Sequence, residues 1–198
     1  MFNGIIKNTG IINRLYKKNN NCFLYILSKI KFTKKEIGSS ISCSGACLTL
    51  EKYNRNLSKF YISKETLSKT IFKTSIKGDI INLEKPLKYG ERISGHFVQG
   101  HVDGVETIST RTTSDTSESR IRISMDSIDP DAIVSKGSVT IEGVSLTIAN
   151  VGENWFEVAI IPTTDALTTL GELKEGDQVN VETDIVARTI AHVVRRMK

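Results

Sequence analysis

Residues 41–50 read ISCSGACLTL, and residues 139–148 read VTIEGVSLTI. The two stretches carry Gly, Leu and Thr at matching places, at an offset of 98 residues. The same offset continues without a gap as far as residues 84 and 182. A register kept over this length indicates two diverged copies of one module. Identical pairs include Gly45 and Gly143, Leu48 and Leu146, Thr49 and Thr147, Thr66 and Thr164, Asn82 and Asn180, and Glu84 and Glu182.

Each copy is typical of β structure. Short runs rich in Ile, Val, Phe and Thr are separated by Gly, Asn and Asp, as in GDIINLE (78–84) and GDQVNVETD (176–184). Many short strands at regular spacing indicate a sandwich or a closed barrel. Since each module has fewer than a hundred residues, we predict an all-β protein of two tandem Greek-key barrels. Short helices are expected at 66–71 and 165–173.

The boundary between the modules is placed near residues 84–94, where Pro86 and Gly90 interrupt the pattern. We therefore expect one barrel in residues 1–93, a second in 94–184 and a helix in 185–198. In this last segment Ile190, Val193 and Val194 follow helical spacing. Its apolar stripe has no third module to cover, so it either mediates oligomerisation or packs on its own barrel.

Composition narrows the class of protein. The 198 residues are 39% hydrophobic, which is sufficient for a core. The apolar runs are far shorter than the ~20 residues of a membrane helix, and the start lacks a secretory signal. We expect a cytoplasmic protein without a membrane partner. Three cysteines argue against a disulfide framework, and the spacing of Cys43 and Cys47 is atypical of zinc sites, so no metal is expected.

The net charge of +5 hides an uneven distribution. Residues 1–97 hold 18 Lys+Arg and 6 Asp+Glu, a net +12, whereas residues 98–198 hold 9 and 16, a net −7. A basic half can bind nucleic acid, but these lysines are scattered without interleaved aromatic residues, so no nucleic-acid partner is expected. The alternatives are a solvated basic face, or docking of this half on the acidic half of a neighbouring subunit.

The stretch SGHFVQGHVDG (94–104) contains two of the three histidines. His96 and His101 are five residues apart, a spacing that places them on opposite faces of a strand and off a common face of a helix, so they should not share a metal. We expect structural hydrogen bonds from His96. His101 follows Gly100, where backbone approaches closely, and it can exchange protons near neutral pH. The sequence lacks a nucleophile triad, a phosphate loop and a dinucleotide fingerprint.

Several motifs together resemble the riboflavin synthase family over nearly the whole chain. They occur in the family's order: MFNGII (1–6), SGACLTL (44–50), SKETL (63–67), SGHFVQGHVDG (94–104), KGSVTIEGVSLTIA (136–149), IIPTT (160–164) and GDQVNVETDIVAR (176–188). The resemblance implies two six-stranded barrels with a C-terminal helix, and a homotrimer with each active site between the N-terminal barrel of one subunit and the C-terminal barrel of the next. It also implies no cofactor, and a lumazine synthase as a candidate partner.

The implied reaction is a dismutation of two 6,7-dimethyl-8-ribityllumazine molecules into riboflavin and 5-amino-6-ribitylaminouracil. Two identical substrates need two similar pockets, and their unequal roles need different side chains. Cys47 accordingly aligns with Ser145, and Glu65 with Thr163. The alternative within the same fold is a carrier that binds lumazine or flavin without catalysis.

The resemblance also assigns residues. Expected substrate contacts in the first pocket are Gly4, Ile5, Ile6, Cys47, Leu48, Thr49 and the strand Tyr61, Ile62, Ser63, Lys64, Glu65 and Thr66. In the second pocket they are Gly100, His101, Val102, Ser145, Leu146, Thr147, Ile160, Ile161, Pro162, Thr163 and Thr164, with Lys136 reaching a ligand shared with the neighbouring subunit. Catalytic candidates are Phe2, Cys47, His101, Ser145 and Asp184.

In the implied mechanism, a C7 methyl group loses a proton and the resulting carbanion attacks the second lumazine. Proximity carries much of the rate, and proton transfer by His101, Ser145 or water adds ~10²–10⁴-fold. Cys47 is expected to form a small polar wall of the pocket. Two positions depart from the family pattern: Thr163-Thr164-Asp165 replaces His or Glu followed by Thr-Leu, and Ser44 stands where asparagine is common.

Overall fold

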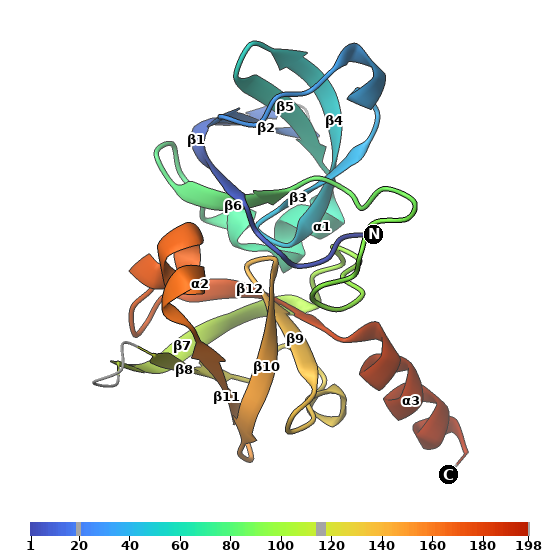
Figure 1. The fold of residues 1–198 in the computed structure, drawn as a ribbon, viewed down its shortest axis with the longest axis vertical. Helices are drawn as coiled ribbons and strands as arrows, with labels where there is room; N and C mark the ends of the chain where they lie inside the picture. Colours follow the sequence, from blue (N-terminus) through green and yellow to red (C-terminus); the bar gives the residue numbers. More distant parts are fainter. Residues whose placement is uncertain (19–20, 114–117, 198) are drawn as a thin grey trace.

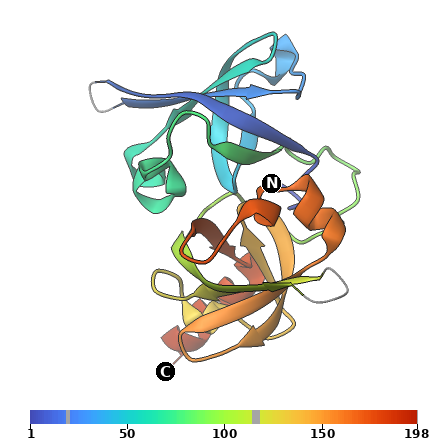
Figure 2. The ribbon, with the colours of Figure 1, turned by 90° about the vertical axis from the view of Figure 1, so that its left-hand side faces the viewer.

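The computed structural model describes residues 1–18, 21–113 and 118–197 and shows two closed antiparallel barrels followed by a helix (Figure 1). The barrels are stacked end to end, with residues 85–103 connecting them, as a view turned by 90° also shows (Figure 2). Helix α3 (Ile185–Arg196) leaves the junction and runs beside the second barrel, next to residues 130–132 (Figure 1). In the described ranges no helix has the length and apolar content needed to span a membrane.

The two barrels have the same strand order. Read around the closed sheet, the first runs β1-β2-β5-β4-β3-β6, and the second runs β7-β8-β11-β10-β9-β12. This order is a Greek key, and it confirms the predicted pair of all-β barrels. The first barrel contains β1 (Asn8–Lys18), β2 (Asn21–Ser28), β3 (Ser40–Cys43), β4 (Ala46–Asn54), β5 (Leu57–Ile62) and β6 (Ile80–Glu84). The second contains β7 (Gly104–Thr113), β8 (Ser119–Ser124), β9 (Ser138–Ile141), β10 (Val144–Val151), β11 (Trp155–Ile160) and β12 (Gln178–Thr183).

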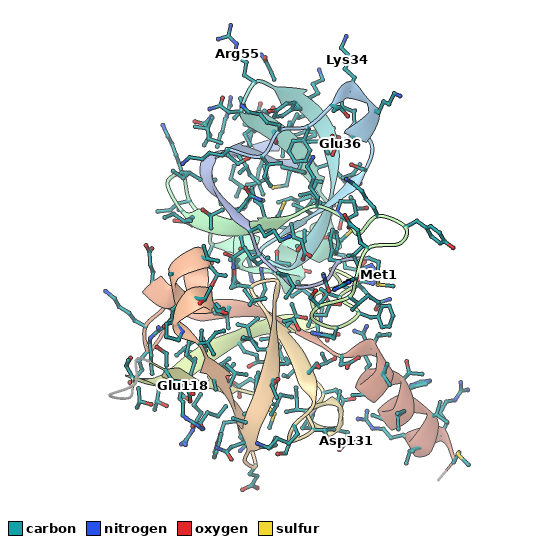
Figure 3. The ribbon with its side chains drawn as sticks, in the orientation of Figure 1. Met1, Lys34, Glu36, Arg55, Glu118 and Asp131 are labelled. Carbon is teal, nitrogen blue, oxygen red and sulfur yellow. The ribbon has the colours of Figure 1, made fainter. Side chains whose placement is uncertain are left out.

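Each barrel encloses its own apolar core. Along β5 and β11 every second side chain is buried, as expected for strands with one face inward. Phe60 and Phe72 are among the large side chains that fill the first core, and Phe156 and Leu170 belong to the second. Figure 3 shows that Lys34 and Arg55 lie at the end of the first barrel that is remote from the second, whereas Met1 lies near the junction.

A short helix follows the fifth strand of each barrel, where it closes one end. These helices are α1 (Lys64–Lys69) and α2 (Pro162–Leu167), and each leads into a 3-10 turn, Ile71–Lys73 and Thr169–Glu172 respectively. Two further 3-10 turns are Lys34–Glu36 and Pro130–Ala132.

Both helices begin earlier than predicted. Ser63 caps α1 because its hydroxyl accepts the Thr66 N–H at 3.0 Å, and Pro162 occupies the first turn of α2, where a missing N–H is tolerated. The prediction of one strand from residue 61 to 66 is therefore wrong beyond Ile62, because the chain turns into α1 at Lys64.

The barrels meet at two equivalent turns, one between β3 and β4 and the other between β9 and β10. A Cβ on Gly45 would lie 2.9 Å from the Gly143 nitrogen, and a Cβ on Gly143 would lie 2.7 Å from the Gly45 nitrogen. Both glycines have positive φ, 84° and 80°. Only glycine fits this contact, which explains why the residue is identical in the two copies.

Two buried asparagines reinforce this contact symmetrically. The Asn82 side-chain N–H₂ donates to the Glu142 carbonyl at 2.9 Å, and the Asn180 side-chain N–H₂ donates to the Ser44 carbonyl at 2.8 Å. The side-chain oxygen of each asparagine accepts a backbone N–H of the other barrel. Because each amide is satisfied only across the junction, the two barrels form one unit.

The two halves of the junction differ at one buried carboxyl group. Glu142 aligns with Ser44, is almost fully buried, and accepts the Asn180 N–H at 2.6 Å. Burial raises the pKa of Glu142 to about 7, and the hydrogen bonds from Asn180 and Ser44 partly oppose this rise. The carboxyl therefore stays protonated in the folded protein at pH values where it ionises in the unfolded chain.

We expect Glu142→Gln to remove a pH dependence of stability. The folded-state pKa of Glu142 lies above the ordinary value of 4.5, so its contribution is complete below pH 4.5 and is lost as the pH rises through about 7. Urea unfolding at a series of pH values should show wild-type stability falling relative to the variant over this window, by on the order of 3 kcal/mol. Parallel pH profiles of the two proteins would contradict the raised pKa.

Candidate functional site

Two backbone segments cross from one repeat to the other. Gly4 precedes the first strand of the first barrel, yet its carbonyl accepts the N–H of Ser145 in β10 at 2.8 Å. Gly100 precedes the first strand of the second barrel, yet its carbonyl accepts the N–H of Cys47 in β4 at 2.8 Å. Each barrel is thus contacted by the backbone segment that precedes the other barrel.

The crossing segments also pair with each other. Phe2 and Val98 form an isolated antiparallel bridge, in which the Phe2 N–H donates to the Val98 carbonyl at 2.7 Å. Both side chains are fully buried. Phe2 lies against Gly100, since a Cβ at that glycine would be 3.0 Å from the Phe2 ring. Phe2 was predicted to lie near the reacting groups. In the structure it is buried and packs against the backbone of Gly100.

A cavity of about 330 Å³ lies where the second crossing segment meets the first barrel. Its polar side chains come from β4, α1 and the segment 100–102, and they include a carboxylate, an imidazole and a thiol. The lining residues are Ala46, Cys47, Glu65, Thr66, Lys69, Thr70, Gly100, His101 and Val102. We call this the first cavity.

A second cavity of about 440 Å³ lies on the second barrel, at the equivalent strand and helix. Its lining residues are Glu118, Arg120, Lys136, Ser145, Leu146, Thr147, Ala149, Ala159, Ile161 and Thr164. We call this the second cavity. Lys136, Ser145 and Thr164 were all predicted to contact a ligand, and the structure brings them together here. In the described part of the chain, the two cavities share no lining residue.

The predicted assignment of the crossing segments to pockets is wrong. Gly100, His101 and Val102 were expected in the second pocket but line the first cavity. Gly4 was expected in the first pocket but contacts Ser145 of the second barrel, and Ile6 is part of the second core. The physical reason is that each crossing segment forms its backbone hydrogen bond with a strand of the other repeat. Ile5 lines a separate groove beside Glu84 and Arg92.

Other predicted contacts lie away from the cavities. Leu48, Ile62 and Ile160 are buried in the barrel cores. Tyr61 packs edge-on against Phe23 on the outer surface, with the ring centroids 5.7 Å apart. The side chains of Thr49, Lys64, Pro162 and Thr163 are exposed, and Ser63 is the cap of α1.

The Ser145 side chain belongs to a short series of hydrogen-bonded polar side chains. The Nδ1 atom of His96 is 2.7 Å from the Ser145 hydroxyl, and its Nε2 atom is 3.1 Å from the Thr140 hydroxyl. Burial lowers the pKa of His96, and the nearby Asp184 carboxylate opposes this effect. Asp184 also caps α3, since it accepts the Val186 N–H at 2.9 Å. A neutral imidazole here can accept a proton from the serine hydroxyl or orient its lone pairs.

His96 is therefore more than the structural histidine expected from the sequence. Its hydrogen bonds match that expectation, but one partner is a predicted site residue. The two cavities therefore differ in chemistry. The first is lined by Cys47, Glu65 and His101, whereas the second is lined by Ser145, whose hydroxyl is hydrogen-bonded to His96. In the residues that the structure describes, no group of three His, Cys, Asp or Glu side chains could hold a metal ion.

Glu84 and Glu182 also help to form the site, although they were not among the predicted site residues. They were recognised only as an identical pair in the repeat. Each accepts hydrogen bonds from consecutive backbone N–H groups of a crossing segment. The sequence did contain a sign of their importance. They are the last identical pair of the repeat, and packing of an apolar core does not require a carboxylate at that position.

Comparisons with known proteins agree with this architecture. The family described as Lumazine binding domain matches residues 3–86 and, again, residues 99–184. The riboflavin synthase of Photobacterium phosphoreum is 38% identical over 201 residues, which are 98% of this chain and 89% of that protein. The riboflavin synthase of Brucella abortus (strain 2308) is 37% identical over 204 residues, with both chains covered completely.

Solved structures of LumP share the fold. LumP complexed with 6,7-dimethyl-8-(1'-D-ribityl) lumazine superposes with a TM-score of 0.78 and 26% identity, covering 92% of this chain and 99% of that chain. LumP complexed with riboflavin superposes with a TM-score of 0.81 at 25% identity over the same shares.

We expect Gly100→Ala to disrupt the first cavity. Gly100 has a φ of 80°, and an added Cβ would lie 2.6 Å from the Cβ of Cys47. The matched control is Gly90→Ala, because Gly90 has a φ of 84° and no atom within 4 Å of the added Cβ. Both variants carry backbone strain, but only Gly100→Ala should lose a further ~1–3 kcal/mol in urea unfolding. Equal losses would mean that the close contact with Cys47 is unimportant.

Proposed function

Because the chain belongs to the riboflavin synthase family of lumazine-binding proteins, we propose that its two cavities hold the two substrate molecules of one reaction. The chain is an enzyme that transfers a four-carbon unit between two molecules of 6,7-dimethyl-8-ribityllumazine, which yields riboflavin and 5-amino-6-ribitylaminouracil. One lumazine loses the four carbons that the other gains, so the overall transfer is balanced between the substrates. The observation that carries the proposal is a pair of equivalent cavities with different polar side chains.

The differences between the cavities support unequal roles for the two substrates. In the first cavity Glu65 and Thr66 lie at the beginning of α1, where they can bind the hydroxyl groups of a ribityl chain. His101 is exposed there and free to exchange protons with a bound ring. In the second cavity the Ser145 hydroxyl, backed by His96, is placed to move a proton at the lumazine methyl group or ring.

The same fold also supports a carrier, because LumP binds lumazine and riboflavin in its solved structures. Three observations favour the enzyme. The identity to riboflavin synthases reaches 37–38%, against 25–26% for LumP. The glycine–histidine segment 95–101 is intact, and the Ser145-Leu146-Thr147 motif lines the second cavity.

We also propose a homotrimer built around α3. The contacts of α3 with its own chain include ion pairs, Arg188 with Asp103 and Arg195 with Asp129 and Asp131; Asp131 lies next to the helix in Figure 3. Its apolar face is exposed, which favours oligomerisation over packing on its own barrel. The exposed residues are Val186 at 55%, Ile190 at 58%, Val193 at 49%, Val194 at 48% and Met197 at 82%.

A trimer would also bring unlike cavities together. Within one chain the two cavities share no lining residue, so substrates bound there need a further arrangement to react. A head-to-tail ring places the first cavity of one subunit against the second cavity of the next. The net +12 of residues 1–97 and net −7 of residues 98–198 are complementary in such a contact. Residues 1–93 and 94–184 would be the two lumazine-binding units, with 185–198 as the trimer segment.

We also propose a cytoplasmic setting and a partner enzyme. Cys22, Cys43 and Cys47 are free thiols, which fits a reducing compartment, and we place the enzyme in the cytoplasm. An enzyme that makes the lumazine must supply it, so a lumazine synthase is the candidate partner.

We expect the purified chain to convert 6,7-dimethyl-8-ribityllumazine into riboflavin without an added cofactor. The absorbance of riboflavin should rise with two lumazines consumed for each riboflavin formed, because one is the donor and one the acceptor. A carrier would instead change the lumazine fluorescence on binding and form no riboflavin. Tight binding without turnover would overturn the enzymatic proposal and retain the lumazine site.

We expect Ile190→Asp to separate the subunits and abolish turnover. A charge in the centre of the apolar face of α3 cannot be buried without a large penalty, so the trimer should dissociate. Sedimentation should show monomers, and turnover should fall by about a hundredfold or more as proximity of the two substrates is lost. The matched control is His192→Asp, on the opposite face of the same helix, which should remain assembled and active. A monomeric Ile190→Asp variant with full turnover would contradict the shared site.

A further inference from the structure

Two carboxylates bind the crossing segments in the same way. Glu84, at the end of β6, accepts the N–H groups of Asn3 and Gly4, each at 3.0 Å. Glu182, in β12, accepts the N–H groups of Gln99 at 2.7 Å and Gly100 at 2.9 Å. The next residue contributes as well, since the His101 N–H donates to Glu182 at 3.0 Å and Ile5 hydrogen-bonds to Glu84.

These hydrogen bonds set the direction of one carbonyl in each segment. A carboxylate that gathers successive N–H groups requires them to point to one side, and the glycine at the centre accordingly has a positive φ, 72° at Gly4 and 80° at Gly100. The glycine carbonyl then points the other way, to Ser145 or to Cys47. Hydrogen bonds to a charged acceptor are stronger than neutral ones, so the carboxylates are the firmest anchors of the segments.

The carboxylate and the cavity that it shapes belong to different barrels. Glu182 is part of the second barrel, but Gly100 and His101 of the segment that it binds line the first cavity beside Cys47. Glu84 is part of the first barrel, but its segment 3–5 contacts Ser145 of the second barrel. We propose that Glu182 is a positioning residue for the first cavity and Glu84 a positioning residue for the second, each acting across the junction.

This inference rests on the proposed function only for the identity of the ligands. Glu182 is 2% exposed and forms no ion pair in the described part of the chain. Its carboxylate instead neighbours another acid, Asp103, which is paired with Arg188. A buried carboxylate whose hydrogen-bond donors are all backbone N–H groups fixes the position of that backbone.

Cys47 offers a direct reporter of the first cavity. Cys22 is 4% and Cys43 0% exposed, whereas Cys47 is half-buried beside Gly100. Iodoacetamide should therefore alkylate Cys47 in the folded protein, at a rate limited by the wall that covers it. We expect Glu182→Gln, which replaces one acceptor oxygen by an N–H₂ group facing the same donors, to raise this rate about fivefold or more. Glu84→Gln should leave it within about twofold of the wild type.

The reciprocal reporter is a cysteine introduced by Ser145→Cys in a Cys47→Ser background. Its alkylation should be accelerated by Glu84→Gln and left nearly unchanged by Glu182→Gln. Mass spectrometry identifies the modified peptide, and circular dichroism confirms that each variant is folded. This crossed pattern distinguishes positioning across the junction from a loss of local stability, which would instead expose the reporter in the barrel that carries the mutation.

A same-barrel response, in which Glu182→Gln affects position 145 and spares Cys47, would overturn the proposal, as would no response in either reporter. If Glu182→Gln fails to fold, the half-buried Glu84 carries the test alone through position 145. The alkylation rates require neither ligand nor turnover. A crossed pattern in a protein that forms no riboflavin would therefore support the positioning role and reject only the enzymatic function.

Discussion

Two backbone hydrogen bonds, from the Ser145 N–H to the Gly4 carbonyl and from the Cys47 N–H to the Gly100 carbonyl, determine the geometry on which both cavities depend. Each joins a segment of one repeat to a strand edge of the other. They require glycine, because a Cβ at either position would lie 2.6 Å from the Cβ of the facing residue. They also require that the barrels stay docked, and this in turn depends on the amides of Asn82 and Asn180. The cavities are therefore properties of the junction as well as of the barrels.

Duplication explains why the backbone is conserved within the chain while side chains differ. The strand order, the glycine turns and the asparagine pair are equal in the two halves, since each is needed to form the same barrel and the same contact. The cavities differ in their side chains: Cys47 in the first cavity corresponds to Ser145 in the second, and His101 of the first cavity corresponds to Ile5, which lines a separate groove. Shared backbone with different side chains is what a reaction between two identical molecules in unlike roles requires.

The sequence predicted the barrels well because the strands within residues 41–84 repeat at one offset in residues 139–182, and apolar alternation reports which faces are inward. The crossing segments escaped prediction for two physical reasons. They align at an offset of 96 residues, as Gly4 with Gly100 shows, and so fall outside the register that revealed the repeat. Their partners are backbone atoms of a distant strand, which leave no side-chain signature. The early start of α1 similarly depends on one hydrogen bond to Ser63, which competes with a continuing strand.

Three acidic side chains, Glu84, Glu142 and Glu182, lie at or beside the junction between the barrels. Burial raises the pKa of Glu84, Glu142 and Glu182, so each carboxyl is less acidic than it would be at the surface. Backbone N–H groups oppose this rise at Glu84 and Glu182, which keeps the charged form accessible where several donors converge. Glu142 has fewer donors and sits at the centre of the contact. Its copy in the first repeat is the neutral Ser44, so two carboxylates never face each other across the junction, where their repulsion would drive the barrels apart.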